Sequence, residues 1–233
     1  MKNSLATDET SAKQQEQAKI IFPYQPDGEY TFKVTHFEEK RFYSFLKRTL
    51  DLLGGVVGLL LFSPLMLLIA CAIKLTSKGP IIYKQERLGY GGKVFQMPKF
   101  RTMVVDAEKD GARWSEGDLD DRIYPFGGFL RKTRLDELPQ LWCCVTGQMS
   151  FIGPRPEREC FALAFEQYIH GFSERLRVKP GITGWAQVNG GYDLRPEEKI
   201  VYDIEYIENR SIGMDLKILC MTFGVVLCRK GAK

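Results

Sequence analysis

An apolar run from Leu52 to Ile73 is the sequence feature that most constrains the fold. It contains no charged residue, and about 20 apolar residues in helical form are enough to cross the roughly 30 Å core of a bilayer. Ser63 and Pro64 lie at its midpoint, and a proline removes a helical hydrogen bond and clashes with the preceding turn. The run therefore predicts a membrane helix that is broken or sharply kinked at its centre.

Basic residues on both sides of this run favour a segment that enters the membrane and returns. Lys47 and Arg48 precede it, and Lys74 and Lys78 follow it. Positive flanks favour the cytoplasmic side of a membrane, so a kinked span would leave one flank on the wrong side. We therefore expect a re-entrant helix-break-helix over residues 38–78, with a kinked span and a buried core helix as the alternatives.

Composition narrows the class of protein further. The 233 residues suffice for one domain and a membrane element, and the net charge is only +4. The basic residues gather at the edges of apolar segments, which suits an anionic lipid surface better than nucleic acid. Six cysteines without a CxxC pair and only two histidines argue against disulfides, a zinc site and histidine catalysis. We expect a cytosol-facing chain that binds no nucleic acid.

The remainder divides into a polar arm, residues 1–37, and a catalytic domain, residues 79–233. Two short strands are expected at 81–85 and 94–97, and the glycine-rich stretch 89–93 between them favours a hairpin turn over a phosphate cradle. The expected fold class is α+β and mainly helical, with a small sheet and amphipathic helices at the membrane interface.

Three further segments have distinct patterns. Residues 157–177 carry apolar side chains at helical spacing, which predicts one amphipathic helix that packs in the core or lies in the lipid interface. Residues 218–228 are apolar but too short to span, so they are either core or interfacial. Residues 106–123 are charged and rich in glycine, which predicts a surface loop that could act as a lid.

Two cations, Lys99 and Arg101, are separated by one residue. On a strand they would share one face, from which they could grip a diphosphate. A solvated surface is the alternative.

The adjacent acids Asp136 and Glu137 are the strongest candidates for chemistry. One reading is a helix start in which Thr133 forms a capping box with Asp136. The other is a catalytic pair, because adjacent helical residues point about 100° apart and can serve two neighbouring roles. In that reading Asp136 attacks a phosphorus atom while Glu137 holds Mg²⁺ against phosphates.

Cations flank this acid pair in the sequence. Arg131 precedes it, and Arg155 follows between Pro154 and Pro156. The prolines restrict the backbone, which would preorganise the Arg155 guanidinium for phosphate.

With these segments in order, the chain resembles the bacterial monotopic phosphoglycosyl transferases, which act on polyprenyl phosphate, and in particular their short, catalytic-domain-only members. The resemblance covers roughly residues 45–220, and the ordered set is much more specific than any single motif. The matching segments read KRTLDLLGG, QERLGYGGKVFQMPKFRTM, RKTRLDELPQLW, MSFIGPRP, KPGITGWAQVNG and YDIEYIENRSIGMDLKIL.

The resemblance implies a role for each candidate residue. It makes Ser63 and Pro64 the break of a re-entrant helix, Asp136 the nucleophile and Glu137 the Mg²⁺ ligand. The phosphate-binding and nucleotide-binding positions that it implies are Arg131, Lys99, Arg101, Arg155, Pro154 and Pro156.

The implied activity is transfer of a sugar 1-phosphate from a UDP-sugar to polyprenyl phosphate. It would take place at the cytoplasmic face of the inner membrane, through a phosphosugar intermediate on Asp136. Two rival hypotheses are the same transfer with Asp136 as a general base in a ternary complex, and a non-catalytic membrane scaffold. The sugar, the glycan pathway and the role of the arm are left open, and a homodimer is one possible assembly.

Overall fold

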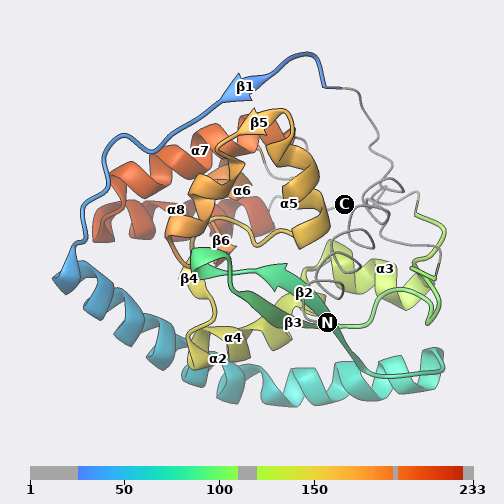
Figure 1. Cartoon of the computed structure of the whole chain (residues 1–233). Coiled ribbons are helices and arrows are strands. Elements are labelled where there is room, and N and C mark those ends of the chain that lie inside the picture. The colour runs from blue at the N-terminus through green and yellow to red at the C-terminus, as the bar shows by residue number, and fades with distance from the viewer. Residues whose placement is uncertain (1–25, 110–119, 191–193, 228–233) are drawn as a thin grey trace, which may run out of the picture.

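The structure is a computed structural model that describes residues 26–109, 120–190 and 194–227 (Figure 1). Within these residues it is mainly helical with small sheets, as the sequence predicts. The helices are α2 (Arg41–Thr76), α3 (Pro125–Lys132), α4 (Leu141–Thr146), α5 (Glu159–Glu166), α6 (Trp185–Asn189), α7 (Pro196–Asn209) and α8 (Ile212–Leu227), with 3₁₀ turns η1 (Tyr90–Gly92), η3 (Leu135–Gln140) and η4 (Phe172–Arg177). The paired strands are β1 (Tyr30–Thr31) with β5 (Ile169–His170), β2 (Ile82–Leu88) with β3 (Val94–Phe100), and β4 (Ser150–Ile152) with β6 (Gly181–Thr183).

The long apolar segment forms α2, which runs along one side of the molecule and changes direction near its middle (Figure 1). The predicted division into two half-helices at Pro64 is wrong for this structure, because α2 is one continuous helix that contains the proline. The proline cannot bond the carbonyl of Leu60. The hydroxyl of Ser63 donates to that carbonyl instead, at 2.8 Å, so the helix bends without ending.

One face of α2 packs against the rest of the protein along its length. In the first half, the Arg48 guanidinium donates to the last carbonyls of α4, and Asp51 accepts hydrogen bonds from β4. In the second half, Ile69 and Ile73 are buried against Phe100 of β3 and residues of α3. A Cβ added at Gly55 would lie 2.9 Å from a methyl carbon of Val145, so the glycine permits this close approach.

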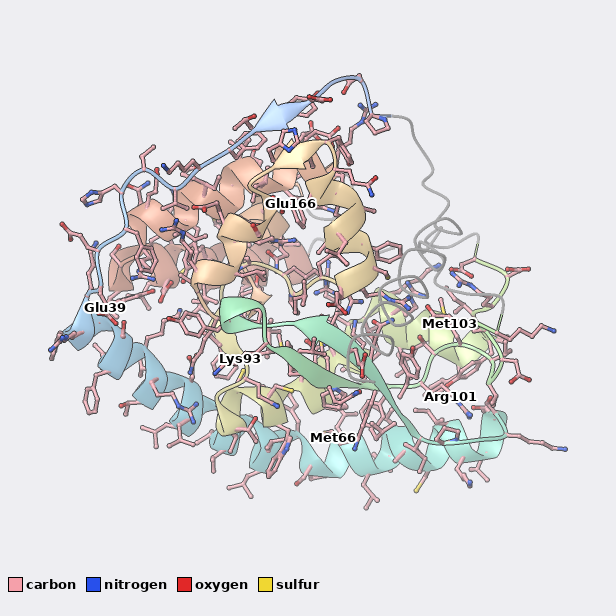
Figure 2. All side chains as sticks on the ribbon, in the orientation of Figure 1. Glu39, Met66, Lys93, Arg101, Met103 and Glu166 are labelled. Atoms are coloured by element: carbon pink, nitrogen blue, oxygen red, sulfur yellow. The ribbon has the colours of Figure 1, made fainter. Side chains whose placement is uncertain are left out.

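The opposite face of α2 is apolar and exposed, and side chains along this helix point away from the rest of the molecule in Figure 2. Within the described chain, α2 is the one helix long and apolar enough to cross a membrane by length and composition. Its exposed side chains include Leu53, Val57, Leu60, Leu61, Leu67 and Leu68.

The predicted hairpin is confirmed as the antiparallel pair β2 and β3, in which Ile82 lies opposite Phe100. The glycine-rich stretch makes its turn, where Gly91 has a φ of 64° and Gly92 a φ of 76°. Such positive values are accessible to glycine without strain. The hairpin matters for the site because β3 packs directly against η3.

The single helix expected over residues 157–177 is wrong. The chain forms α5, then β5, then η4, and Gly171 separates the last two at a φ of 94°. Pairing of β5 with β1 supplies the backbone hydrogen bonds that a longer helix would have provided. The apolar side chains nevertheless form a core, as the first of the two alternatives states, through Phe161, Phe165, Ile169 and Phe172.

Three segments of the sequence analysis lie partly outside the described residues. Of the arm, residues 26–37 are described and cross the domain (Figure 1), where Val34 is buried in the core cluster beside α7 and α8. Residues 1–25 and 110–119, the latter from the proposed lid, are not described. In the C-terminal segment, Ile218 of α8 is fully buried, which supports the core reading at that position.

Candidate active site

The two acids lie on the short 3₁₀ turn η3, which the flanking chain holds in place. Arg134 precedes it with a φ of 55° and ψ of 17°, a left-handed conformation that is uncommon for residues other than glycine. The capping-box reading is wrong, because Thr133 ends α3 and its hydroxyl donates to the Phe129 carbonyl at 2.8 Å. A 3₁₀ turn has three residues per turn, so Asp136 and Glu137 point about 120° apart and have different neighbours.

Glu137 is held between two cations. Its Oε1 accepts hydrogen bonds from Lys99 Nζ at 3.0 Å and from Arg155 Nη2 at 2.5 Å, while the residue is only 8% exposed. Burial alone would raise the pKa of Glu137, but the charges of Arg155 and Lys99 outweigh it and hold the pKa well below the usual range. Glu137 is therefore ionised at neutral pH.

Asp136 has the opposite environment. It is 7% exposed, and no hydrogen bond to its carboxylate comes from the part of the chain that the structure describes. Burial raises the pKa of Asp136 to about 6; Lys99 opposes this rise and the charge of Glu137 adds to it. Two adjacent carboxyl groups with separated pKa values are typical of sites that assign them different roles.

The structure holds Arg155 in place through its backbone as well as its side chain. The carbonyl of Pro154 accepts a hydrogen bond from β6 at 2.9 Å, that of Arg155 from Arg175 Nη2 at 2.9 Å, and that of Pro156 from Arg87 Nη1 at 3.1 Å. Hydrogen bonds thereby hold three successive carbonyls of the Pro-Arg-Pro segment. The backbone of Arg155 is fixed by them, and its guanidinium reaches Glu137 from this fixed position.

Arg175 and Asp203 were missed by sequence reasoning. Their side chains form an ion pair at 2.7 Å that is almost completely buried, and the Arg175 guanidinium lies 4.8 Å from the centre of the Phe172 ring. No motif or spacing links η4 to α7, so the pairing depends on tertiary structure. Its consequence is that Arg175 is fixed where it can hold the Arg155 carbonyl.

Lys99 and Arg101 do not act on a common face as the spacing predicts. Lys99 bonds Glu137, but the Arg101 guanidinium donates to the carbonyls of Ser77 and Lys78 at 2.9 and 2.6 Å. Arg101 lies one residue beyond the end of β3, so strand alternation no longer sets its direction. In this structure it stabilises the exit from α2. Arg131, by contrast, is close enough to Asp136 to lower its pKa.

The carboxylate oxygens at the site fit a magnesium ion that would be bound partly by the protein and partly by the phosphates of the substrate. No group of three or more acids, histidines or cysteines converges among the described residues, so no all-protein metal cage is seen there. Both cations bond Oε1 of Glu137, which leaves Oε2 as a candidate ligand. Mg²⁺ commonly binds through one or two carboxylates together with substrate phosphates, and this arrangement meets that requirement.

Comparison with known proteins identifies the family. Residues 42–229 match the model of the family described as bacterial sugar transferase. The chain is 40% identical, over 86% of its length, to the UDP-N-acetylgalactosamine-undecaprenyl-phosphate N-acetylgalactosaminephosphotransferase of Aeromonas hydrophila. It is 42% identical, over 76% of its length, to the UDP-glucose:undecaprenyl-phosphate glucose-1-phosphate transferase of Escherichia coli K12.

These alignments cover only part of the two relatives, 50% of the first and 39% of the second. A putative undecaprenyl-phosphate N-acetylgalactosaminyl 1-phosphate transferase of Bacillus subtilis is 46% identical over 58% of the chain and 74% of the relative. The catalytic candidates described above all lie within the residues that the family model matches. The chain belongs to the bacterial sugar transferase family.

Proposed function

We propose that the chain transfers a sugar 1-phosphate from a UDP-sugar to polyprenyl phosphate, giving polyprenyl-diphosphate-sugar and UMP. The observation that carries the proposal is the contrast between the two acids. Glu137 is kept ionised by Lys99 and Arg155, while Asp136 is buried beside the same cations and receives no hydrogen bond on its carboxylate from the described residues. Such a carboxylate is poorly stabilised as an anion and is therefore available to attack phosphorus.

In the first step an oxygen of ionised Asp136 bonds to the phosphorus that carries the sugar. The bond from that phosphorus to the bridging oxygen breaks, and UMP leaves with the electron pair. The Arg155 guanidinium, which lies at Glu137, supplies positive charge beside the leaving phosphate. Lys99 and Arg131 supply further positive charge around Asp136.

In the second step an oxygen of polyprenyl phosphate attacks the phosphosugar on Asp136. The bond between the aspartyl oxygen and phosphorus breaks, and the carboxylate is released. The sugar keeps its own C–O bond throughout, so its anomeric configuration is retained.

Glu137, through Oε2, is the residue that would hold Mg²⁺ against the donor phosphates. When bound, the ion would neutralise negative charge on the oxygens of the donor diphosphate. The ionised state of Glu137 at neutral pH, held by Arg155 and Lys99, suits this role.

A second mechanism, for the same reaction, has specific support. A carboxyl group with a pKa of about 6 is also suited to general-base catalysis near neutral pH. Asp136 would then take a proton from an attacking acceptor in a ternary complex. Only the covalent route releases UMP before the lipid acceptor arrives, so the two mechanisms are separable.

The proposal places α2 in the cytoplasmic leaflet of the inner membrane as a re-entrant, monotopic anchor. Both halves of α2 contact the domain through one face, and the other face is apolar. A span perpendicular to the bilayer would carry the polar contacts of Arg48 or the loop after Thr76 into lipid, where unsatisfied backbone groups are costly. The anchor would hold the site at the boundary where a soluble donor meets a lipid acceptor.

A transfer assay tests the proposal. Purified protein in nanodiscs that contain undecaprenyl phosphate is incubated with Mg²⁺ and radiolabelled UDP-glucose, UDP-galactose or UDP-N-acetylgalactosamine, and organic-extractable label is counted. We expect transfer from at least one donor, loss of more than about 10³-fold in Asp136→Asn, and normal transfer in Asp106→Asn, an exposed acid. Equal transfer by Asp136→Asn and the unsubstituted chain would refute the assigned role.

A further inference from the structure

The described part of the arm, residues 26–37, is bound to the domain along its length. Its strand β1 pairs with β5, and the Phe32 amide continues this pairing by donating to the His170 carbonyl at 2.8 Å. Val34 is only 4% exposed. Figure 1 shows the segment crossing the domain beside β5 and α7. These residues precede the stretch that the family model matches, which begins at residue 42.

The arm lies directly on the first residues of η4. Glu174 Oε2 accepts a hydrogen bond from the Val34 amide at 3.0 Å. Gly171, the residue before η4, has no room for a side chain, because an added Cβ would overlap the carbonyl oxygen of Phe32. The arm and η4 are therefore fixed relative to one another at two points.

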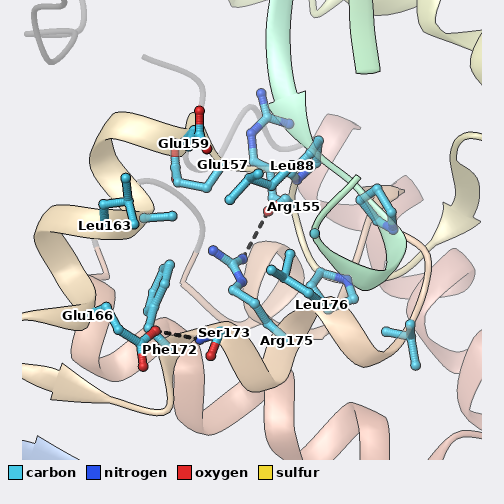
Figure 3. Close-up of a pocket in the computed structure, with 16 residues that line it drawn as sticks. Leu88, Arg155, Glu157, Glu159, Leu163, Glu166, Phe172, Ser173, Arg175 and Leu176 are labelled. Atoms are coloured by element: carbon cyan, nitrogen blue, oxygen red, sulfur yellow. Dashed lines mark hydrogen bonds between the residues drawn. The ribbon is translucent and has the colours of Figure 1, made fainter. Parts of the chain in front are cut away.

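Arg175, the next residue of η4, leads from the arm to the catalytic acids. Its Nη2 donates to the Arg155 carbonyl at 2.9 Å, a hydrogen bond drawn in Figure 3. The guanidinium of Arg155 in turn bonds Glu137. A continuous series of hydrogen bonds and covalent bonds thereby joins Val34 of the arm to Glu137 of the site.

The short turn η4 needs support from outside. A 3₁₀ helix has poorer hydrogen-bond geometry than an α-helix, and η4 contains six residues. At its start Glu166 accepts hydrogen bonds from the amides of Gly171 and Ser173 at 2.7 and 2.8 Å, the second of which is drawn in Figure 3. At Glu174 the arm provides the support, and the other partner seen among the described residues, Arg177, belongs to η4 itself.

Glu208 of α7 holds the arm in this position. One of its oxygens accepts hydrogen bonds from the amide and the hydroxyl of Thr35, each at 2.7 Å, and from the His36 amide at 3.3 Å. The hydrogen bonds from Thr35 hold the pKa of Glu208 below its ordinary value. Within the described chain, none of the hydrogen bonds of Glu208 goes to η4. A change at Glu208 therefore loosens the arm without altering η4 or the site.

We propose that residues 30–37 of the arm position Arg155 for the transfer reaction, an inference that rests on the proposed function. The arm fixes η4, Arg175 on η4 fixes the backbone of Arg155, and the Arg155 guanidinium lies at Glu137 and the leaving phosphate. A displacement of about 1 Å in a catalytic group can cost roughly 10²-fold in rate. Glu174 and Glu208 are positioning residues in this arrangement.

Steady-state kinetics of the full chain in nanodiscs with undecaprenyl phosphate test the proposal. Glu208→Ala and Glu174→Ala should each lower kcat roughly tenfold and change KM for the UDP-sugar less than about twofold, because the acids and their cations are all retained. Glu174→Gln keeps an oxygen that accepts from Val34 and should restore most of the rate. Glu39→Ala, at an exposed position between the arm and α2, should change neither constant.

A double substitution tests whether the arm acts through Arg155. Arg155→Lys removes the guanidinium that the arm positions, so Glu208→Ala should slow this variant by less than about twofold more. The full loss in the Arg155→Lys background would mean that Glu208→Ala weakens the fold in general, and it would overturn the proposal. Unchanged kcat in both Glu208→Ala and Glu174→Ala would also overturn it.

Hydrogen exchange measured by mass spectrometry is a readout that does not need chemistry. Glu208→Ala should speed exchange in residues 171–178 and leave residues 82–100 unchanged, since the β2–β3 hairpin lies outside the series of contacts. Unchanged exchange in 171–178 would refute the hold of the arm on η4, whatever the donor assays give. Faster exchange in a chain that transfers from no donor would support that hold and refute the proposed function instead.

Discussion

Replacement of Asp136 by asparagine should stabilise the fold while it abolishes function. The pKa of Asp136 is about 6 in the fold against 3.8 for an unperturbed aspartate. Each pKa unit corresponds to about 1.36 kcal/mol, so ionisation of this buried carboxyl costs about 3 kcal/mol of stability at pH 8. Asparagine carries no charge and avoids that cost, although its buried amide loses about 1–2 kcal/mol when it is not hydrogen-bonded.

The sign of the pH dependence follows from the raised pKa. Between pH 3.8 and 6 the folded state of Asp136 holds its proton while the unfolded state has released it. Stability of the unsubstituted chain therefore falls as pH rises through this window, and the cost is fully present above pH of about 6. The advantage of Asp136→Asn should shrink by about 2 kcal/mol when the pH is lowered from about 8 to about 4.5.

Thermal unfolding measured by near-ultraviolet circular dichroism, in detergent with EDTA to remove divalent cations, gives the comparison. A net gain of about 1–2 kcal/mol at pH 8 corresponds to a rise in Tm of roughly 2–8 °C for a chain of this size. Asp106→Asn, at an exposed position, should not change Tm. Destabilisation by Asp136→Asn at both pH values, or a gain that does not depend on pH, would refute the reasoning about burial.

Four other predictions concern the site and the anchor. Lys99→Met removes one of the two cations that bond Glu137. It should reduce transfer about 10- to 100-fold, as expected for the loss of a charge-assisted hydrogen bond. Lys84→Met, at an exposed position of the same hairpin, should not reduce transfer. The rate of the first step should fall below pH of about 6, because only ionised Asp136 attacks, and a pH profile of UMP release measures this. Asp51→Ala removes the buried acceptor that ties α2 to β4 and should lower Tm by roughly 4–8 °C, for a loss of about 2 kcal/mol. Chelation of Mg²⁺ with EDTA should abolish UMP release without unfolding the chain, and excess Mg²⁺ should restore it.

Local signals in the sequence were sufficient for the elements whose partners are near in the chain. The glycine-rich turn between two short strands predicts the β2–β3 hairpin, and the apolar run predicts helical structure where α2 lies, although not its continuity through Pro64. The acid pair and the Pro-Arg-Pro segment are recognisable by motif, and the fold brings Glu137 and Arg155 into contact.

Long-range contacts account for what the sequence did not predict. The helix expected over residues 157–177 is interrupted because β5 pairs with β1, far away in the chain. Arg101 has the spacing of a second phosphate ligand, but unpaired carbonyls at the end of α2 bind its guanidinium. The Arg175–Asp203 pair depends on two segments that no local pattern relates.

Pro64 in α2 shows a different limit of prediction from the sequence. Its lost hydrogen bond is local, and so is the compensation by the hydroxyl of Ser63. The sequence placed Ser63 and Pro64 at a break or a sharp kink, but did not decide between the two. That choice depends on the domain contacts that hold both halves of α2.

The covalent intermediate is the central claim, and intact mass spectrometry tests it most directly. The purified chain is mixed with Mg²⁺ and a panel of UDP-sugars in the absence of any lipid acceptor. The account predicts a mass increase of one phosphosugar with at least one donor, release of an equal amount of UMP, and no adduct in Asp136→Asn. Absence of an adduct with a donor that supports normal transfer once polyprenyl phosphate is added would contradict the account and favour Asp136 as a general base.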